Sequence, residues 1–164
     1  MKKIVFVLVC ALFAAGVSAQ KIGHIHSDSL LQIMPEYEAA QQQLEALSLE
    51  YEKALKQQEA ELQAKYEAYL QLPATTPAAI KQNKEAELQQ LQQGLQEFAV
   101  TIQNDLDQEQ TKLLKPVYDK AKDAIQAVAK ANGFTYVIDA STGVLLFENG
   151  EDIMGLVKTH LGLL

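Results

Sequence analysis

The sequence has no arginine, no tryptophan and a single cysteine, Cys10, among its 164 residues. Its 14 lysines are outnumbered by 21 acidic residues, so the net charge at pH 7 is −7. A protein that binds nucleic acid needs a basic footprint, and electrostatic adhesion to anionic lipid needs clustered basic residues. The composition therefore disfavours both kinds of partner.

Long apolar runs are also scarce, and the only one, residues 4–15, is too short to span a membrane. It follows Lys2 and Lys3 and precedes the small residues Val17-Ser18-Ala19. This order is typical of a cleavable secretory signal peptide, so we predict that residues 1–19 are removed and that the protein is periplasmic. Removal would take away Cys10, both N-terminal lysines and no acidic residue, which lowers the net charge from −7 to −9. The mature chain would then have no disulfide and no integral membrane segment.

Proline is rare, and its four positions divide the chain. The segments between Pro35, Pro73, Pro77 and Pro116 are rich in Ala, Leu, Glu, Gln and Lys, which are strong helix formers. We predict one helix over residues 35–72 and a second over residues 77–132, with a tip near residues 73–77. Thr76 is the predicted N-cap of the second helix, and Asn132-Gly133 its C-cap.

Apolar residues recur along both predicted helices in steps of three and four that repeat every 11 residues. An 11-residue period gives about 3.67 residues per turn, so two such helices should run nearly straight or slightly right-handed. One narrow stripe per helix cannot build a globular core. We predict an antiparallel α-helical hairpin, a coiled-coil-like arm over residues 35–114 and on the order of 55 Å long. The stripe consists of Leu44, Leu47, Tyr51, Leu55, Gln58, Leu62, Tyr66 and Tyr69, followed by Leu91, Leu95, Phe98, Ile102, Leu106, Glu109, Leu113 and Val117.

The register of this hairpin places two prolines at one level. Counting equally from the tip puts Leu114 opposite Pro35, and Pro116 lies two residues further along. Proline inside a helix removes a backbone hydrogen bond and bends the helix. We therefore expect a bend at Pro116, where the arm meets the rest of the protein.

The remaining residues, 20–34 and 115–164, are predicted to form a small β-rich body. Residues 21–26 are a candidate strand, and Ser29-Leu30-Leu31-Gln32 has the spacing of a capping box for a short helix up to Met34. Residues 134–138 and 144–147 are interpreted as a β-hairpin around the turn-rich residues 139–143. Glu151 or Asp152 should cap a final amphipathic helix whose apolar face contains Ile153, Leu156, Val157 and Leu161.

The body is too small to be stable alone, since it has neither a disulfide nor an evident metal site. Three strands also leave open sheet edges. The predicted fold class is therefore α+β, a long antiparallel helical hairpin that projects from a small β-rich oligomerisation body. The candidate oligomerisation residues are Ile22, Ile25, Tyr136, Val137, Ile138, Val144 and Leu146.

The usual sequence motifs of enzymes are absent. There is no P-loop, no Gly-x-Ser-x-Gly and no Gly-x-Gly-x-x-Gly. His24 and His26 would share one face of a strand, an arrangement that could begin a metal site, but no third ligand is evident, so structural or surface histidines are favoured. Asp139 beside Ser141 is interpreted as a turn cap. We predict no enzyme activity, no catalytic residue, no metal and no cofactor.

The order of these features resembles the OmpH/Skp family of periplasmic chaperones over essentially the whole mature chain. The resemblance is carried by Lys-Ile-Gly-His-Ile-His-Ser-Asp at residues 21–28, Met-Pro-Glu-Tyr at 34–37, Tyr-Val-Ile-Asp at 136–139, Gly-Val-Leu-Leu-Phe at 143–147 and Asp-Ile at 152–153. It implies a homotrimer whose strands form a central body and whose arms enclose a cavity. That cavity would hold unfolded outer-membrane proteins without ATP.

Within such an arm, residues near the tip are candidates for contact with unfolded proteins. The tyrosines Tyr51, Tyr66 and Tyr69 lie on the stripe, where they serve either as hairpin core or as a contact surface. Leu70 and Leu72 lie off the stripe, so they are candidates for exposed contacts. The predicted contact residues are Tyr66, Tyr69, Leu70 and Leu72. The alternative function is a periplasmic structural coiled-coil spacer or adaptor.

Overall fold

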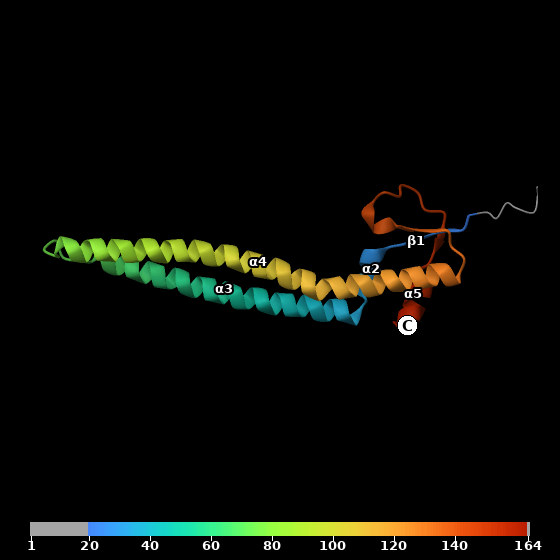
Figure 1. Cartoon of the computed structure of the whole chain (residues 1–164), viewed down its shortest axis with the longest axis horizontal. Coiled ribbons are helices and arrows are strands. Elements are labelled where there is room, and N and C mark those ends of the chain that lie inside the picture. Colours follow the sequence, from blue (N-terminus) through green and yellow to red (C-terminus); the bar gives the residue numbers. More distant parts are fainter. Residues whose placement is uncertain (1–19, 164) are drawn as a thin grey trace, which may run out of the picture. The chain divides into compact units, whose positions relative to one another are not determined.

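Figure 1 shows the computed structural model of the chain, in which residues 20–163 are described. The described chain is mostly helical and carries a small sheet. The signal peptide predicted for residues 1–19, with Cys10, lies outside the described residues. The elements are β1 (Ile22–Ile25), α2 (Ser27–Gln32), α3 (Pro35–Leu70), α4 (Ala78–Ala131), β2 (Tyr136–Asp139), the 3-10 turn η1 (Ala140–Thr142), β3 (Glu151–Asp152) and α5 (Met154–Leu161).

The chain divides into two compact units. The first unit combines residues 20–33 with residues 120–163, and the second is residues 34–119. Helix α4 crosses the boundary, so its last 12 residues belong to the first unit and the preceding part to the second.

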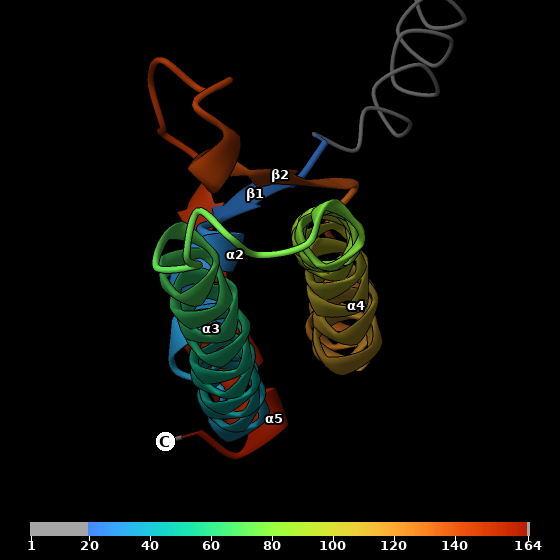
Figure 2. The ribbon, with the colours of Figure 1, turned by 90° about the vertical axis from the view of Figure 1, so that its left-hand side faces the viewer.

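The sheet of the first unit is built around β1. Its strand order is β2-β1-β3, and both neighbours run parallel to β1. Strands β1 and β2 are labelled in Figure 2. Ile22 is aligned with Tyr136 on one side, and Gly23 with Glu151 on the other. A parallel pair needs a long crossover connection. Between β1 and β2 that connection consists of α2, α3 and α4.

The predicted β-hairpin over residues 134–138 and 144–147 is wrong. Residues 136–139 do form a strand, but its partner is β1, and residues 144–147 adopt no regular structure. The turn-rich segment 139–143 forms η1 and ends at Gly143 in the left-handed conformation, with a φ of 69°. The chain therefore leaves the sheet after Asp139 and returns only at Glu151, on the other side of β1.

The core of the first unit gathers side chains from both ends of the chain. Residues Ala121, Ala124 and Val128 recur at steps of three and four, which places them on one face of α4. On the predicted apolar face of the final helix, Ile153 and Val157 are fully buried, whereas Leu156 is 38% exposed. The buried apolar residues of this unit are Ile25, Leu30, Leu31, Ala121, Ala124, Val128, Ala140, Ile153 and Val157.

A carboxylate from β2 caps α2. The predicted capping box at Ser29 and Gln32 is wrong, because α2 begins two residues earlier, at Ser27, and the side chain of its N-cap residue, His26, accepts no capping hydrogen bond. Instead, Asp139 accepts hydrogen bonds from the amide and hydroxyl of Ser27, at 3.2 and 2.5 Å. It also accepts from the amide and hydroxyl of Ser141, at 3.0 and 2.6 Å, so its predicted role as a turn cap is confirmed.

The second unit contains α3 and most of α4, which lie side by side in both views (Figures 1 and 2). Pro35 is the first residue of α3, as predicted. Proline is suited to this position because the N–H that it lacks would make no hydrogen bond within the helix there. Helix α4 starts at Ala78, and the carbonyl of Pro77 accepts from Ile80 and Lys81, so the predicted N-cap at Thr76 is one residue early. Helix α4 continues through Pro116, and the expected bend there stays a prediction.

The C-terminal end of α4, in the first unit, follows the predicted Asn132-Gly133 cap. Gly133 has a φ of 69°, which suits glycine. The amide of Phe134 donates to the carbonyl of Ala129 at 3.0 Å, and the side-chain amide of Asn132 donates to the carbonyl of Val128 at 2.8 Å. These bonds satisfy carbonyls that the helix end would leave unpaired.

Replacing Ile153 by Ala tests the core of the first unit. The side chain is fully buried, so its loss should lower the free energy of unfolding by about 2–4 kcal/mol. Leu156→Ala is the matched control, because Leu156 is exposed and its truncation should cost well under half as much. Urea unfolding followed by circular dichroism measures both. Equal losses for the two variants would contradict the assigned core.

Replacing Asp139 by Asn tests the cap of α2. Burial opposes ionisation of Asp139, but the hydrogen bonds from Ser141 and Ser27 together outweigh it and lower the pKa of the carboxyl. Because the pKa is lower in the folded state, the charged carboxylate stabilises the fold above the unfolded pKa, and this contribution disappears as the pH falls through the folded pKa. We expect Asp139→Asn to cost about 2 kcal/mol at pH 7 and progressively less below pH 4. Urea unfolding at a series of pH values measures this, and a pH-independent difference would contradict it.

Candidate functional site

Polar contacts tie α3 to α4 along the second unit. The hydroxyl of Tyr51 donates to Asp105 at 3.0 Å, Lys65 is paired with Glu87, and the hydroxyl of Tyr69 donates to Glu85. The partners are 54, 22 and 16 residues apart in sequence, so their separation falls steadily towards the connecting loop. The two helices therefore run in opposite directions.

Charge holds the second of these three contacts, between Lys65 and Glu87. Glu87 accepts hydrogen bonds from Lys65 and Lys84, and these lower the pKa of Glu87 to about 2. The carboxylate is therefore ionised at any physiological pH. The hydrogen bonds to Asp105 and Glu85 raise the pKa values of Tyr51 and Tyr69, so both phenols remain protonated donors.

The 11-residue stripe predicted from the sequence marks the less exposed face of both helices. On α4 all predicted members are half-buried except Val117, which is fully buried. On α3 the members are half-buried except Gln58 and Tyr66, which are exposed. Across residues 41–113, all of which the structure describes, no side chain is fully buried. The stripe is an apolar surface that this chain only partly covers.

The stripe has one unfilled level. A cleft of about 880 Å³ opens between α3 and α4, lined by Gln58 and Lys65 on α3 and by Leu91, Gly94 and Phe98 on α4 together with polar neighbours. Gly94 has no side chain, and a Cβ built there would have no neighbour within 4 Å. Gln58 is the one polar member of the stripe on α3. Because neither residue supplies an apolar side chain, apolar packing between the helices is interrupted at this level.

The four predicted contact residues lie near the tip, with unequal exposure. Tyr66 is 48% and Leu70 is 63% exposed, whereas Tyr69 and Leu72 are half-buried. Tyr69 is held by Glu85, so its ring is less available to a partner than that of Tyr66.

The predicted oligomerisation residues in the first unit fall into two groups. Ile25 is fully buried, and Val137 and Ile138 are half-buried, so these three support the unit itself. The other four are exposed at the surface of this chain: Ile22, Tyr136, Val144 and Leu146.

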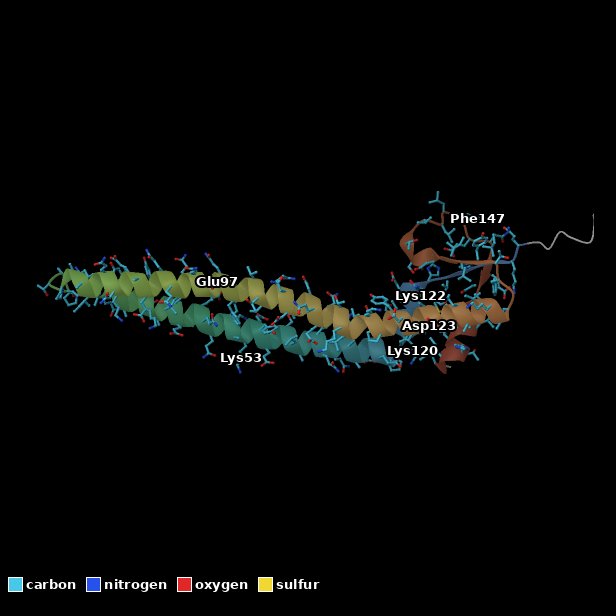
Figure 3. All side chains as sticks on the ribbon, in the orientation of Figure 1. Lys53, Glu97, Lys120, Lys122, Asp123 and Phe147 are labelled. Atoms are coloured by element: carbon cyan, nitrogen blue, oxygen red, sulfur yellow. The ribbon has the colours of Figure 1, made fainter. Side chains whose placement is uncertain are left out.

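Sequence reasoning missed several exposed apolar side chains. Phe147 is 79% exposed beside Leu146 and is labelled in Figure 3. Ile80 is exposed near the start of α4, and Leu49 and Val100 are exposed on α3 and α4 away from the stripe. The positions of Leu49 and Val100 off the 3-4 spacing were the available signal, since an apolar residue outside a helix stripe faces water.

The histidine pair of β1 contacts a carboxylate and is not part of a recognisable metal site in the described residues. His24 and His26 both approach one carboxylate, that of Glu148, at 3.2 and 3.6 Å. In the described part of the chain, no group of three or more His, Cys, Asp or Glu residues is arranged to hold a metal ion. Among the helices of residues 20–163, none combines the length and apolar character of a membrane span.

The two units define a class of proteins in which a small parallel sheet accompanies a long pair of opposed helices. Residues 21–161 match the family described as outer membrane protein (OmpH-like). The chain belongs to the OmpH-like family, as its sequence motifs predicted.

Two relatives show how far the likeness extends. The chaperone protein Skp of Pectobacterium atrosepticum is 27% identical over 146 residues, which cover 89% of this chain and 88% of that protein. The crystal structure of an OmpH-like protein from Caulobacter crescentus CB15 superposes with a TM-score of 0.72 at 19% identity, covering 90% of this chain and 86% of the other. At that identity the structural match establishes the fold.

Replacing Gly94 by Ala tests the unfilled level of the helix pair. Alanine favours the helix by about 1 kcal/mol over glycine, and the added methyl group meets no neighbour. We expect the variant to raise the free energy of unfolding by roughly 0.5–1 kcal/mol. Gly133→Ala is the matched control, because its φ of 69° disfavours alanine and should lower stability by about 1 kcal/mol. Thermal unfolding measures both, and a destabilised Gly94→Ala would show that this level is packed.

Proposed function

We propose that this chain is an ATP-independent periplasmic holdase, which binds unfolded outer-membrane proteins and prevents their aggregation in transit. The observation that carries the proposal is the stripe on α3 and α4. From Leu44 to Leu113 its members are apolar except Gln58 and Glu109, and none of them is fully buried. An ordinary helix pair buries such a stripe, and an exposed apolar surface of this length is typical of a binding surface.

The form of the surface suits unfolded partners better than folded ones. An unfolded chain offers scattered apolar side chains without fixed geometry, so it is held by many weak contacts and not by one shaped pocket. The stripe offers such contacts along α3, whose 36 residues span about 54 Å. Tyr66 and Leu70 would add exposed contacts near the tip.

The relatives support the same conclusion. The Pectobacterium relative is named a chaperone, and the family is described by its likeness to OmpH. The predicted signal peptide would direct the protein to the periplasm, which outer-membrane proteins must cross unfolded. The sequence offers no nucleotide-binding motif, in keeping with a chaperone that holds partners without ATP.

The first unit is proposed to be the oligomerisation body, with residues 35–114 projecting from it as arms. Strands β2 and β3 are the edges of the sheet, and open edges with apolar neighbours favour association. Ile22, Tyr136, Val144 and Leu146 are exposed in the single chain and would be covered by other copies. The resemblance implies a homotrimer, in which several arms would surround one unfolded protein.

Shortening the helix pair tests whether oligomerisation and the binding of unfolded proteins reside in different parts of the chain. We would replace residues 52–104 by a short glycine-containing turn, which retains Tyr51 and Asp105, the pair that joins the helices at that level. The shortened protein should keep the oligomeric mass of the full-length protein in sedimentation. It should lose suppression of light scattering by an unfolded outer-membrane β-barrel, because most of the stripe is gone.

Two full-length variants refine this test. Replacing Tyr66 and Leu70 by Ser should weaken suppression about two- to fivefold, since two exposed apolar contacts are lost. Replacing Lys53 and Gln63, which are exposed and polar, by Ser is the control and should leave suppression unchanged. If the shortened oligomer suppresses aggregation fully, the helices are a spacer and the holdase proposal is wrong. If the shortened protein is monomeric while the full-length one is not, the assignment of the body is wrong.

A further inference from the structure

The cleft at Gly94 is bounded along α4 by an apolar side chain on each side. Leu91 lies three residues before Gly94 and Phe98 four residues after it, so the three positions share one face of the helix. Both side chains are half-buried, and a Cβ placed between them at Gly94 would meet nothing within 4 Å. The volume of about 880 Å³ lies within the range of ligand sites in proteins. The cleft therefore has room for a large apolar side chain together with its neighbours in the sequence.

Contacts between the helices limit the cleft at both ends. The ion pair between Lys65 and Glu87 lies at its end towards the connecting loop. The hydrogen bond from Tyr51 to Asp105 joins the helices beyond the other end. Because α3 and α4 are joined on both sides of the gap, the cleft is already formed in the single chain.

Gln58 lines the cleft from α3 with its hydrogen-bonding groups unused. The residue is exposed, and its side chain makes no hydrogen bond to any residue that the structure describes. A side-chain amide offers two donor hydrogens and an acceptor oxygen, which are the groups that pair with peptide C=O and N–H. An unfolded chain has such backbone groups free. The one polar member of the stripe on α3 therefore suits a peptide backbone that lies in the cleft.

The charge around the cleft leaves one carboxylate without a partner. Three glutamates and one lysine line it: Glu61, Glu87, Glu97 and Lys65. Lys65 pairs with Glu87 and lies 4.0 Å from Glu61, and Lys84 also pairs with Glu87. Glu97, labelled in Figure 3, has no cation partner among residues 20–163. Three carboxylates thus face two lysines, and the uncompensated negative charge is that of Glu97.

We propose that this cleft is a subsite for one large apolar side chain of an unfolded protein, in segments where lysine or arginine stands beside that side chain. The apolar group lies between Leu91 and Phe98, the backbone bonds to Gln58, and the basic group pairs with Glu97. Charge disfavours a second copy of this chain as the occupant, because its net charge is −7. The proposal rests on the proposed holdase function, since it names the segments that the helix pair prefers.

The backbone amide of Gly94 reports occupation of the cleft, because Gly94 is the only glycine between residues 24 and 132. Labelling the protein with ¹⁵N-glycine gives one nuclear magnetic resonance signal from the helix pair, which is assigned by its loss in Gly94→Ala. The probe is the peptide Ser-Lys-Phe-Lys-Ser, compared with Ser-Glu-Phe-Glu-Ser and Ser-Lys-Ala-Lys-Ser. We expect the first peptide to shift the Gly94 signal at concentrations at least threefold lower than the other two, with the remaining glycine signals unmoved.

Two outcomes of this titration would overturn the proposal. The first is a Gly94 signal that moves with none of the peptides, or equally with all three. The second is a Gly94 signal that moves with protein concentration and not with peptide, because a second copy of the chain would then occupy the cleft.

Removing the unpaired carboxylate tests the preference for basic segments. Glu97→Gln should weaken binding of the Lys-Phe-Lys peptide about two- to threefold, the effect of one exposed ion pair. Glu67→Gln is the matched control and should leave binding unchanged, because Glu67 lies outside the cleft lining. The two carboxylates have the same setting, since Gln63 donates to Glu67 and Gln93 to Glu97, both at 2.8 Å. Fluorescence anisotropy of a labelled peptide measures both variants, and equal losses would contradict the role of Glu97.

Filling the cleft tests the apolar part of the subsite. Gly94→Leu places a side chain between Leu91 and Phe98 and should weaken binding of the peptide at least fivefold. Gln89→Leu adds the same group at an exposed position outside the lining and should not weaken it. If Gly94→Leu, shown by thermal unfolding to be folded, binds the peptide as well as the unmodified protein, the subsite is wrong. Peptide binding is measured without aggregation, so failure of the unmodified protein to suppress light scattering would contradict the holdase proposal separately.

Discussion

The parallel pairing of β1 with strands on both sides is the constraint on which the rest of the chain depends. β2 lies more than 100 residues after β1, and a long crossover connection is needed for it to enter the sheet parallel to β1. Helices α3 and α4, which run in opposite directions, form most of that connection. The two ends of the chain then meet in one core, where Ile25, Val128 and Val157 are buried together within the first unit.

Local sequence patterns predicted the helices correctly but predicted the wrong strand pairing in the sheet. Pro35 and the Asn132-Gly133 pair fix helix ends through backbone geometry alone, and both were placed correctly. Strand direction depends on partners distant in sequence, so the apolar run at 144–147 resembled a second strand although no strand among residues 20–163 pairs with it. For the same reason the true cap of α2 was missed, because Asp139 is 112 residues from Ser27.

Only part of the candidate site could be predicted from the spacing of residues in the sequence. The 11-residue stripe identified the less exposed face of α3 and α4, because helix geometry follows from spacing. It did not identify the open level at Gln58 and Gly94, which requires the register between the helices. Nor did spacing reveal that Glu148 meets His24, since those residues lie on separate segments that only the folded unit brings together.

The central claim is that the partly covered stripe is where unfolded proteins are held. Site-specific photocrosslinking tests it most directly, with a benzophenone amino acid at Leu95, on the stripe, or at Lys53, on the exposed face. An unfolded outer-membrane β-barrel should crosslink strongly to position 95 and weakly to position 53, and folding of the barrel should abolish the crosslink. Equal crosslinking at both positions, or crosslinking at position 53 alone, would contradict the account.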